Sequence, residues 1–406
     1  MRNKLRKLFI LFLTFFSTLF LLKYLINNRK VGFINEIYFQ LPLVMYSEKL
    51  CNNYQNLIES SLDNSYSVTI IDDKGIIIGS LNENKLRIPA SNLKLFSTAY
   101  SINKFDVSDK LDTSIFKDKL NNFYLKGSGD PDLSLSEISN LIKRIKINRS
   151  SKFNIIEIND KTKWPSGWTE SDKLYTYGSP ITTLAINSNQ NQTLDINYLK
   201  RDIENQLKNN YPSKKIDVNI LEYDKSYEKN LKLVDKISSN PILSLISLAN
   251  SESHNFTAEI LYKNASKSWN YDGYNNLKIW LKRRGLPVSN ISIKDASGLS
   301  RSNRITTKLT ALFLHKMKFN KQFDFYNSSL SILGIRGTLS NKMSDRNTKG
   351  RFFGKTGTLS NVFALSGYLY KENQILSISI IQNSSKIDIN NAFKFIEDLY
   401  NLEKCY

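Results

Sequence analysis

Two residues near position 90 have the types and the spacing of a nucleophile and its base. Ser91 and Lys94 are three residues apart, and the recurrence of Leu93, Phe96 and Tyr100 predicts a helix that places both side chains on one face. A serine hydroxyl attacks only when a base removes its proton. A lysine is such a base when burial or a second cation lowers its pKa.

Ser253 and Asn255, in the order S-x-N, stand where two helical patterns meet. The Ser253 hydroxyl has the chemistry to relay a proton between a lysine and a leaving group, and the Asn255 side chain has the chemistry to hold a substrate amide. The pair alone also fits a helix cap, since serine and asparagine favour that position.

A third polar segment is Gly354-Lys-Thr-Gly-Thr358, just before a predicted hairpin. Lys355 suits a substrate carboxylate, with the Thr356 hydroxyl beside it. Gly357 lacks a Cβ, so a bound chain can lie against the strand. The Thr358 N–H, together with that of Ser91, suits an oxyanion hole. Alone, the segment also fits an ordinary turn.

The remaining chain predicts the elements that position these segments. Helices are expected over residues 35–62, 202–209, 240–253, 255–261, 274–284, 308–317 and 390–402, and strands over residues 66–71, 76–81, 153–158, 181–187, 218–223, 352–355, 362–370 and 375–382. The strands near both chain ends would form one antiparallel sheet, with the terminal helices on one face and the helices of Ser91 and Ser253 on the other.

This α+β arrangement divides the chain into parts. Residues 31–105 and 237–406 are expected to build the sheet and its helices, and residues 106–236 a smaller, mostly-β inserted domain with its own core. Residues 1–30 are expected to be a signal anchor or a signal peptide.

The N-terminal residues carry the pattern of an export signal. Basic residues between Arg2 and Lys7 precede the uncharged run Leu8–Leu22, and residues 8–26 approach the length of a short membrane span. The basic flank predicts that the rest of the chain is exported, to the periplasm. An uncleaved anchor in the cytoplasmic membrane is slightly preferred to a cleaved peptide, because no A-x-A-like site follows.

The composition limits the class of protein. With 406 residues, 41% of them hydrophobic, the chain can bury real cores. Its net charge is +20, but no basic run with interleaved aromatic residues occurs, so no nucleic-acid partner is expected; the charge fits a solvated surface or an anionic polymer or membrane. Two histidines argue against a Ser-His-Asp triad, and no metal or cofactor is expected.

Cys51 and Cys405 lie at opposite ends of the sequence. Two free or solvent-shielded thiols are the preferred interpretation. A disulfide between them is the alternative, since the two chain ends would pack together if the sheet forms as expected.

The order S-x-x-K, S-x-N, K-T-G is the motif set of penicillin-binding proteins and active-site serine β-lactamases. The chain resembles, more closely, the class C penicillin-binding proteins of the D-alanyl-D-alanine carboxypeptidase/endopeptidase type, which carry an insertion after the nucleophile helix. Further matching segments are Gly127–Leu133, Tyr177–Ile181, Ser253–Leu261, Asp295–Arg301, Gly337–Leu339 and Gly354–Ser360.

The resemblance implies the transpeptidase-like fold of that family and a serine enzyme that acts on peptidoglycan stem peptides. Ser91 would attack a D-Ala-D-Ala or cross-link bond, with Lys94 as base and Ser253 as proton relay. Asn255 and Lys355 would orient the substrate. Water would release the product, and β-lactams would acylate the serine and leave slowly.

In the same comparison Thr356 and Thr358 would lie beside the substrate carboxylate. Asp160 stands where some relatives direct an acidic residue to the free amino group of the substrate; a turn-capping role is the alternative. His254 replaces the aspartate usual in the second motif, and a structural role is preferred for it. The competing functions are a serine β-lactamase or esterase and a non-catalytic cell-wall-binding protein.

Overall fold

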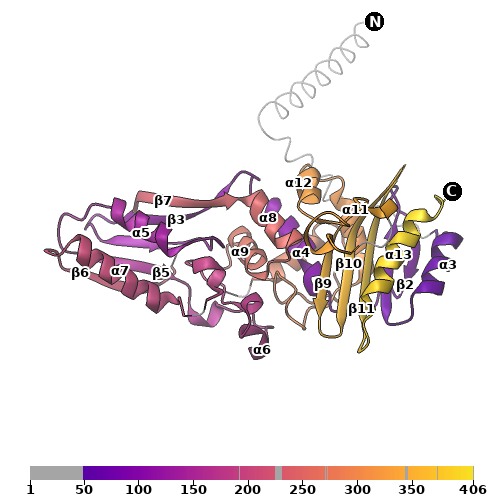
Figure 1. Ribbon diagram of the computed structural model, residues 1–406, viewed down its shortest axis with the longest axis horizontal. Coiled ribbons are helices and arrows are strands. Elements are labelled where there is room, and N and C mark those ends of the chain that lie inside the picture. Colours follow the sequence, from indigo (N-terminus) through magenta and orange to yellow (C-terminus); the bar gives the residue numbers. More distant parts are fainter. Residues whose placement is uncertain are drawn as a thin grey trace, which may run out of the picture.

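The computed structural model describes residues 49–405 except 192, 225–230, 270, 272, 343–345 and 373, and for Asp160 the backbone alone. The predicted signal segment 8–26 and the first part of the helix expected over 35–62 lie outside these residues. Among the helices that are described, none has both the length and the apolar character that crossing a membrane requires. Figure 1 shows an elongated molecule with a sheet towards each end and helices between the two sheets.

The larger sheet joins strands from both ends of the chain, in the order β2-β1-β11-β10-β9-β8. Every pairing in it is antiparallel, and β1 runs beside β11 with Tyr66 opposite Gln382. The antiparallel sheet expected from the sequence is therefore confirmed. Its strands are β1 (Tyr66–Ile71), β2 (Ile77–Leu81), β8 (Ser331–Ile332), β9 (Phe352–Leu359), β10 (Val362–Lys371) and β11 (Gln374–Asn383).

One face of this sheet is covered by the helices nearest the two chain ends, α3 (Asn52–Ser61) and α13 (Ile389–Asn401) (Figure 1). Tyr54 and Ile58 of α3 and Phe395 and Ile396 of α13 are fully buried in the core between helices and sheet. Both helices are amphipathic, so burial of their apolar sides fixes them on the sheet. This placement agrees with the expectation from the sequence.

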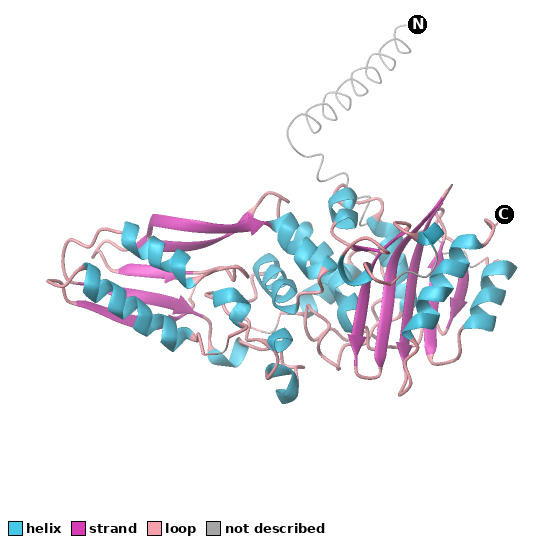
Figure 2. Cartoon of the chain, in the orientation of Figure 1, coloured by secondary structure: helices cyan, strands magenta, loops and turns pink. Residues whose placement is uncertain are grey.

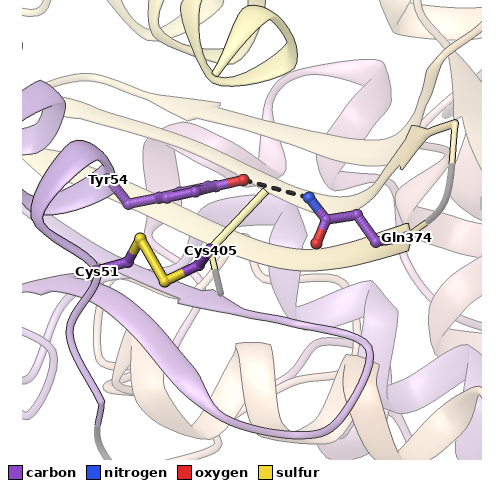
Figure 3. Close-up of a disulfide and its surroundings, with 4 residues drawn as sticks. All are labelled: Cys51, Tyr54, Gln374 and Cys405. Carbon is purple, nitrogen blue, oxygen red and sulfur yellow. Dashed lines mark hydrogen bonds between the residues drawn. A yellow bond between two sulfur atoms is a disulfide. The ribbon is translucent and has the colours of Figure 1, made fainter. Parts of the chain in front are cut away.

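Cys51 and Cys405 form a disulfide, so the preferred interpretation of two free thiols is wrong. Their Cα atoms are 5.9 Å apart across a sequence separation of 354 residues. Figure 3 shows the bond beside Tyr54, whose hydroxyl accepts a hydrogen bond from Gln374 Nε2 at 3.3 Å. The packing of α13 against α3 brings the two cysteines together, and spacing along the sequence carries no sign of that contact.

The opposite face of the sheet carries the helices that hold the motif residues. Figure 2 shows these helices in the middle of the molecule. Phe96, Ile260 and Phe313 are among the fully buried side chains of this second core. The elements are the 3-10 turn η1 (Ala90–Leu93), α4 (Lys94–Ile102), α8 (Ile242–Ser251), α9 (Asn255–Ser266), α10 (Asn275–Lys282), α11 (Thr307–Met317) and α12 (Phe323–Ser328).

The inserted residues form a second sheet in the order β6-β5-β4-β3-β7, with its own core. Strands β4, β5 and β6 are parallel, and α5 and α7 connect them. Its elements are β3 (Lys110–Lys117), β4 (Phe123–Lys126), α5 (Leu135–Arg144), β5 (Ser151–Glu157), α7 (Ile196–Asn210), β6 (Ile216–Glu222) and β7 (Lys232–Pro241).

Two expectations about this region are wrong. The insertion is not mostly β, because parallel strands need crossover connections, and here these are helices (Figure 2). The strand expected over 181–187 is irregular chain that ends in the 3-10 turn η4 (Ile186–Asn189). Ile181 and Leu184 are buried there, so the apolar run reflects packing of a loop and not a strand. The last strand, β7, also continues past residue 236 to Pro241.

Candidate active site

Ser91 lies in η1, which packs against β9. A Cβ added to Gly357 would lie 2.8 Å from the backbone nitrogen of Ser91, closer than a side chain permits. Asn92, the next residue, donates from Nδ2 to the Lys355 carbonyl at 2.8 Å. The glycine of the third motif therefore lets the strand approach the nucleophile, and the asparagine fastens the two segments together.

The loop that contains Asp295–Arg301 supports the same turn from another direction. Gly298 has a φ of +85°, and an added Cβ would lie 1.9 Å from the Ala90 carbonyl oxygen. Ala90 itself adopts a φ of 47°, a region that costs a non-glycine residue energy. Contacts from β9 and from this loop thus hold the backbone before Ser91 in a strained conformation.

Lys94 is fully buried at the start of α4. Its Nζ donates to Ser91 Oγ at 2.9 Å, to Asn255 Oδ1 at 2.6 Å and to the Ser297 carbonyl at 2.8 Å. Burial lowers the pKa of Lys94 to about 7, although the Asp295 and Glu259 carboxylates oppose the shift. The lysine is therefore close to half neutral at neutral pH.

The partners of Lys94 decide how the neutral amine is oriented. The Ser297 carbonyl can only accept, and Asn255 presents its oxygen because its Nδ2 donates to the Tyr177 carbonyl at 3.0 Å. A neutral amine has two N–H groups and one lone pair. If the two N–H groups go to these oxygens, the lone pair faces the Ser91 hydroxyl, the one partner that has a proton to give.

Lys355 is fully buried in β9, and its Nζ donates to the Thr356 carbonyl at 2.9 Å. Burial lowers the pKa of Lys355 well below its ordinary value; the charge of Lys94 adds to this, and Glu252 opposes it. Thr356 Oγ1 donates to Thr338 Oγ1 at 2.7 Å, which links β9 to the turn η6 (Gly337–Leu339).

Thr358 is exposed near the end of β9, opposite Phe363 of β10. The two strands are joined by a two-residue turn after Leu359, so the pair at Thr358 is one that exchanges no hydrogen bonds across the ladder. Its N–H consequently points to the free edge of β9, since β8 pairs only as far as Gly354. Gly357, the residue before Thr358, lies against the backbone nitrogen of Ser91.

Ser253 lies in the short junction between α8 and α9, with a φ of 62°, and Asn255 is the first residue of α9. The contact of Asn255 with Lys94 brings this junction to the nucleophile. His254 makes a 2.7 Å hydrogen bond through Nδ1 with Thr257 Oγ1, and burial lowers its pKa to about 4. A neutral histidine bonded to its own helix agrees with the structural role preferred for it.

The structure thus brings Ser91, Lys94 and Asn255 into contact and places Gly357 of β9 against the Ser91 backbone. Asp160 begins the short turn η2 (Asp160–Thr162), and the role predicted for its side chain stays a prediction. The described residues contain no group of three or more histidine, cysteine or acidic side chains placed to hold a metal ion.

Sequence reasoning missed the residues behind the lysine. Tyr177 and Ser297 offer backbone carbonyls, which no side-chain pattern reveals. Glu259 and Asp295 are fully buried carboxyl groups close enough to influence the lysine charge. All four lie in segments that the family resemblance had singled out without giving these residues a role: Tyr177–Ile181, Ser253–Leu261 and Asp295–Arg301.

The chain is similar to known proteins both in its sequence and in its fold. The profile described as the D-Ala-D-Ala carboxypeptidase 3 (S13) family matches residues 59–200 and 193–400. The D-alanyl-D-alanine carboxypeptidase of an Actinomadura species is 33% identical over 104 residues, 24% of this chain and 19% of that protein. The penicillin-sensitive carboxypeptidase A of Dictyostelium discoideum is 33% identical over 142 residues, 29% of this chain and 27% of that protein.

The matched segments therefore span about a fifth to a quarter of these curated relatives. The solved penicillin-binding protein 4 from Haemophilus influenzae superimposes with a TM-score of 0.69 at 18% identity, over 85% of this chain and 98% of that one. At this identity the likeness establishes the fold, and the fold class expected from the sequence is confirmed.

Proposed function

Because the chain belongs to the D-Ala-D-Ala carboxypeptidase 3 (S13) family, we propose that it is a serine D-Ala-D-Ala carboxypeptidase or endopeptidase that acts on peptidoglycan stem peptides. The observation that carries this proposal is the contact of Lys94 Nζ with Ser91 Oγ, with the other two acceptors of the amine already defined. A serine hydroxyl that faces the lone pair of a buried neutral amine is an activated nucleophile.

The reaction runs through an acyl-enzyme. Lys94 takes the proton as Ser91 Oγ attacks the carbonyl carbon, and the N–H groups of Ser91 and Thr358 receive the developing oxyanion. The protonated Lys94 passes this proton through the Ser253 hydroxyl to the leaving amine, so the lysine is neutral again. Water then attacks the ester while Lys94 takes a proton from it, and the lysine gives that proton to Ser91 Oγ as the ester bond breaks.

Substrate binding falls to the residues around the nucleophile. Asn255 orients an amide of the stem peptide, and Lys355 with the Thr356 and Thr358 hydroxyls receives the terminal carboxylate. Gly357 leaves room for the peptide beside β9. Asp160 is proposed to face the free amino group of the substrate.

The test is covalent labelling by a fluorescent penicillin. A β-lactam carbonyl takes the place of the peptide carbonyl, so wild-type protein is expected to take one label, located on Ser91 by peptide mass. Ser91→Ala is expected to take none. Wild-type protein that takes no label would exclude the enzyme in favour of the non-catalytic wall-binding alternative.

The β-lactamase alternative needs rapid loss of the acyl group. Stopped-flow turnover of a chromogenic β-lactam distinguishes the two: a peptidase is expected to give a burst and a slow steady state, whereas rapid multiple turnover would contradict the proposal. Digestion of purified cross-linked muropeptides, followed by mass, separates the carboxypeptidase (loss of D-Ala) from the endopeptidase (cleavage of the cross-link).

The proposal extends to location and domain organisation. A disulfide between Cys51 and Cys405 suits an oxidising compartment, which supports export to the periplasm, with residues 8–26 as a membrane anchor unless they are cleaved. Residues 31–105 and 237–406 would form the transpeptidase-like domain and residues 106–236 the inserted one. β-Lactams and peptidoglycan peptides are the proposed binding partners.

A further inference from the structure

Two fully buried carboxyl groups lie behind the nucleophile and its base, and the mechanism above gives them no part. Glu259 is on α9, four residues after Asn255, so the two side chains share a helix face. Asp295 begins the loop whose Gly298 lies against η1. A buried carboxyl without a paired cation is costly, so each must be held by hydrogen bonds.

Glu259 is joined to the base through one residue, Ser297. Its Oε1 accepts from the N–H groups of Ala296 and Ser297 at 2.9 and 2.8 Å, and its Oε2 accepts from the Tyr274 hydroxyl at 2.7 Å. The carbonyl of the same Ser297 accepts from Lys94. Helix α9 thus contacts the lysine twice, directly through Asn255 and indirectly through Glu259.

Asp295 keeps the loop itself in place. Its Oδ1 accepts from Gly298 N at 2.9 Å and Asn303 Nδ2 at 2.8 Å, and its Oδ2 accepts from Ser300 N at 2.6 Å and Trp168 Nε1 at 3.0 Å. These partners are all neutral donors. Asp295 therefore stabilises the loop itself, whereas the Glu259 carboxyl accepts from the N–H of Ser297, the residue whose carbonyl faces the base.

We propose that Glu259 is a positioning residue for the base: it holds the Ser297 carbonyl against Lys94 and, when ionised, favours the charged form of that lysine. The inference rests on the proposed function, in which Lys94 must be neutral to act. Burial alone would leave the lysine too weak a base, and the carboxylate restores proton affinity toward the range where a general base works best near neutral pH.

The charges around Lys94 fit this role. The Asp295 and Glu259 carboxylates act to raise the lysine pKa, while Lys355 on β9 and His254 before α9 are close enough for the lysine charge to lower theirs. Burial, with the charge of Asp295, raises the pKa of Glu259 itself to about 7. Lysine and glutamate therefore titrate in the same range and behave as a coupled pair.

The test compares Glu259→Gln with wild type by the pH dependence of penicillin acylation between pH 5 and 9. Glutamine keeps the shape and the acceptor oxygen but removes the charge. The acid limb of the rate profile is therefore expected to move to lower pH, by less than about one unit, because Glu259 with a pKa of about 7 is ionised over only part of that limb. Tyr274→Phe removes a hydrogen bond to the carboxylate and is expected to shift the limb the same way by less. The exposed helix-capping carboxyl provides a matched control, Glu137→Gln, which is expected to follow the wild-type profile.

A second measurement does not depend on activity. In a Ser91→Ala background, the ¹³Cε chemical shift of Lys94, assigned by its loss in Lys94→Arg, reports protonation of the amine directly. Its midpoint is expected to fall when Glu259→Gln is added. Superimposable titrations and rate profiles with and without Glu259→Gln would overturn this inference alone, whereas an unlabelled wild-type protein would overturn the proposed function.

Discussion

At the scale of single residues, the site depends on the charge state of one amine. Lys94 is cut off from water, and two of its three partners are oxygens that only accept. Burial favours the neutral form of the lysine by lowering its pKa, and the Asp295 and Glu259 carboxylates reduce the size of that shift. The reactivity proposed for Ser91 therefore depends on the burial of Lys94 and on the partners of that amine.

The acylation rate is accordingly expected to rise with pH through about 7, since the lysine must lose its proton to act and burial lowers its pKa to about 7. Lys94→Arg, which stays charged at every accessible pH, is expected to lower the rate about 10³-fold and to remove this dependence. Stopped-flow labelling at several pH values measures both effects. The exposed Lys110→Arg serves as control, and a Lys94→Arg protein that is acylated at the wild-type rate would refute the assignment.

At the scale of elements, the nucleophile turn is fixed by close backbone contacts on two sides. Because Gly357 has no side chain, β9 can lie against the Ser91 backbone nitrogen. Because Gly298 has none, the Asp295–Arg301 loop can lie against the Ala90 carbonyl. Neither approach tolerates a side chain. The oxyanion geometry thus depends on two glycines that carry no functional group of their own.

Gly298→Ala is expected to lower the acylation rate about 10²-fold, because a shift of about 1 Å at the nucleophile is enough for that loss. Gly350→Ala makes a matched control: its φ is also positive, at +73°, but the added Cβ would meet only the end of the Ile335 side chain, at 3.1 Å. Both variants pay about 1–2 kcal/mol for the left-handed backbone. Labelling kinetics on folded protein should separate them, and equal rates for the two would contradict the role given to Gly298.

At the scale of the whole molecule, the larger sheet joins strands from the two ends of the sequence. Strand β1 pairs with β11, and a disulfide joins residues 51 and 405 (Figure 3). Helices α3 and α13 pack together on the face of the sheet away from the site (Figure 1). The inserted sheet leaves and returns on the other side of helices α8 and α9 (Figure 1). The disulfide and the candidate site therefore lie on opposite faces of one sheet.

Loss of the disulfide is expected to lower the free energy of unfolding by about 2–5 kcal/mol, since it closes a very long loop in the unfolded chain. Denaturant unfolding of wild type with and without reductant measures this, with the double variant Cys51→Ser/Cys405→Ser as a protein that reductant should not affect. The acylation rate of the folded protein is expected to stay unchanged. Two alkylatable thiols in the native, unreduced protein would show that the bond is absent.

Much of the fold followed from pattern. Alternating β-branched runs predicted the hairpins β1–β2 and β10–β11, and helical spacing predicted α11 and α13. These are local signals that burial on one face imposes on the sequence. The strand expected at 181–187 and the mostly-β insertion failed because an apolar run looks alike in a strand, a buried loop and a crossover helix.

By itself, the sequence determined which residues could do the chemistry: Ser91, Lys94, Ser253, Asn255 and Lys355 were identified by motif order and residue type. Only the tertiary structure decided what controls them. The acceptors of the lysine are partly backbone carbonyls, its carboxylates come from segments far away in the sequence, and the cysteine pair meets across 354 residues. Motifs record side-chain type, whereas burial, proton affinity and backbone contact arise only when distant segments enclose a common space.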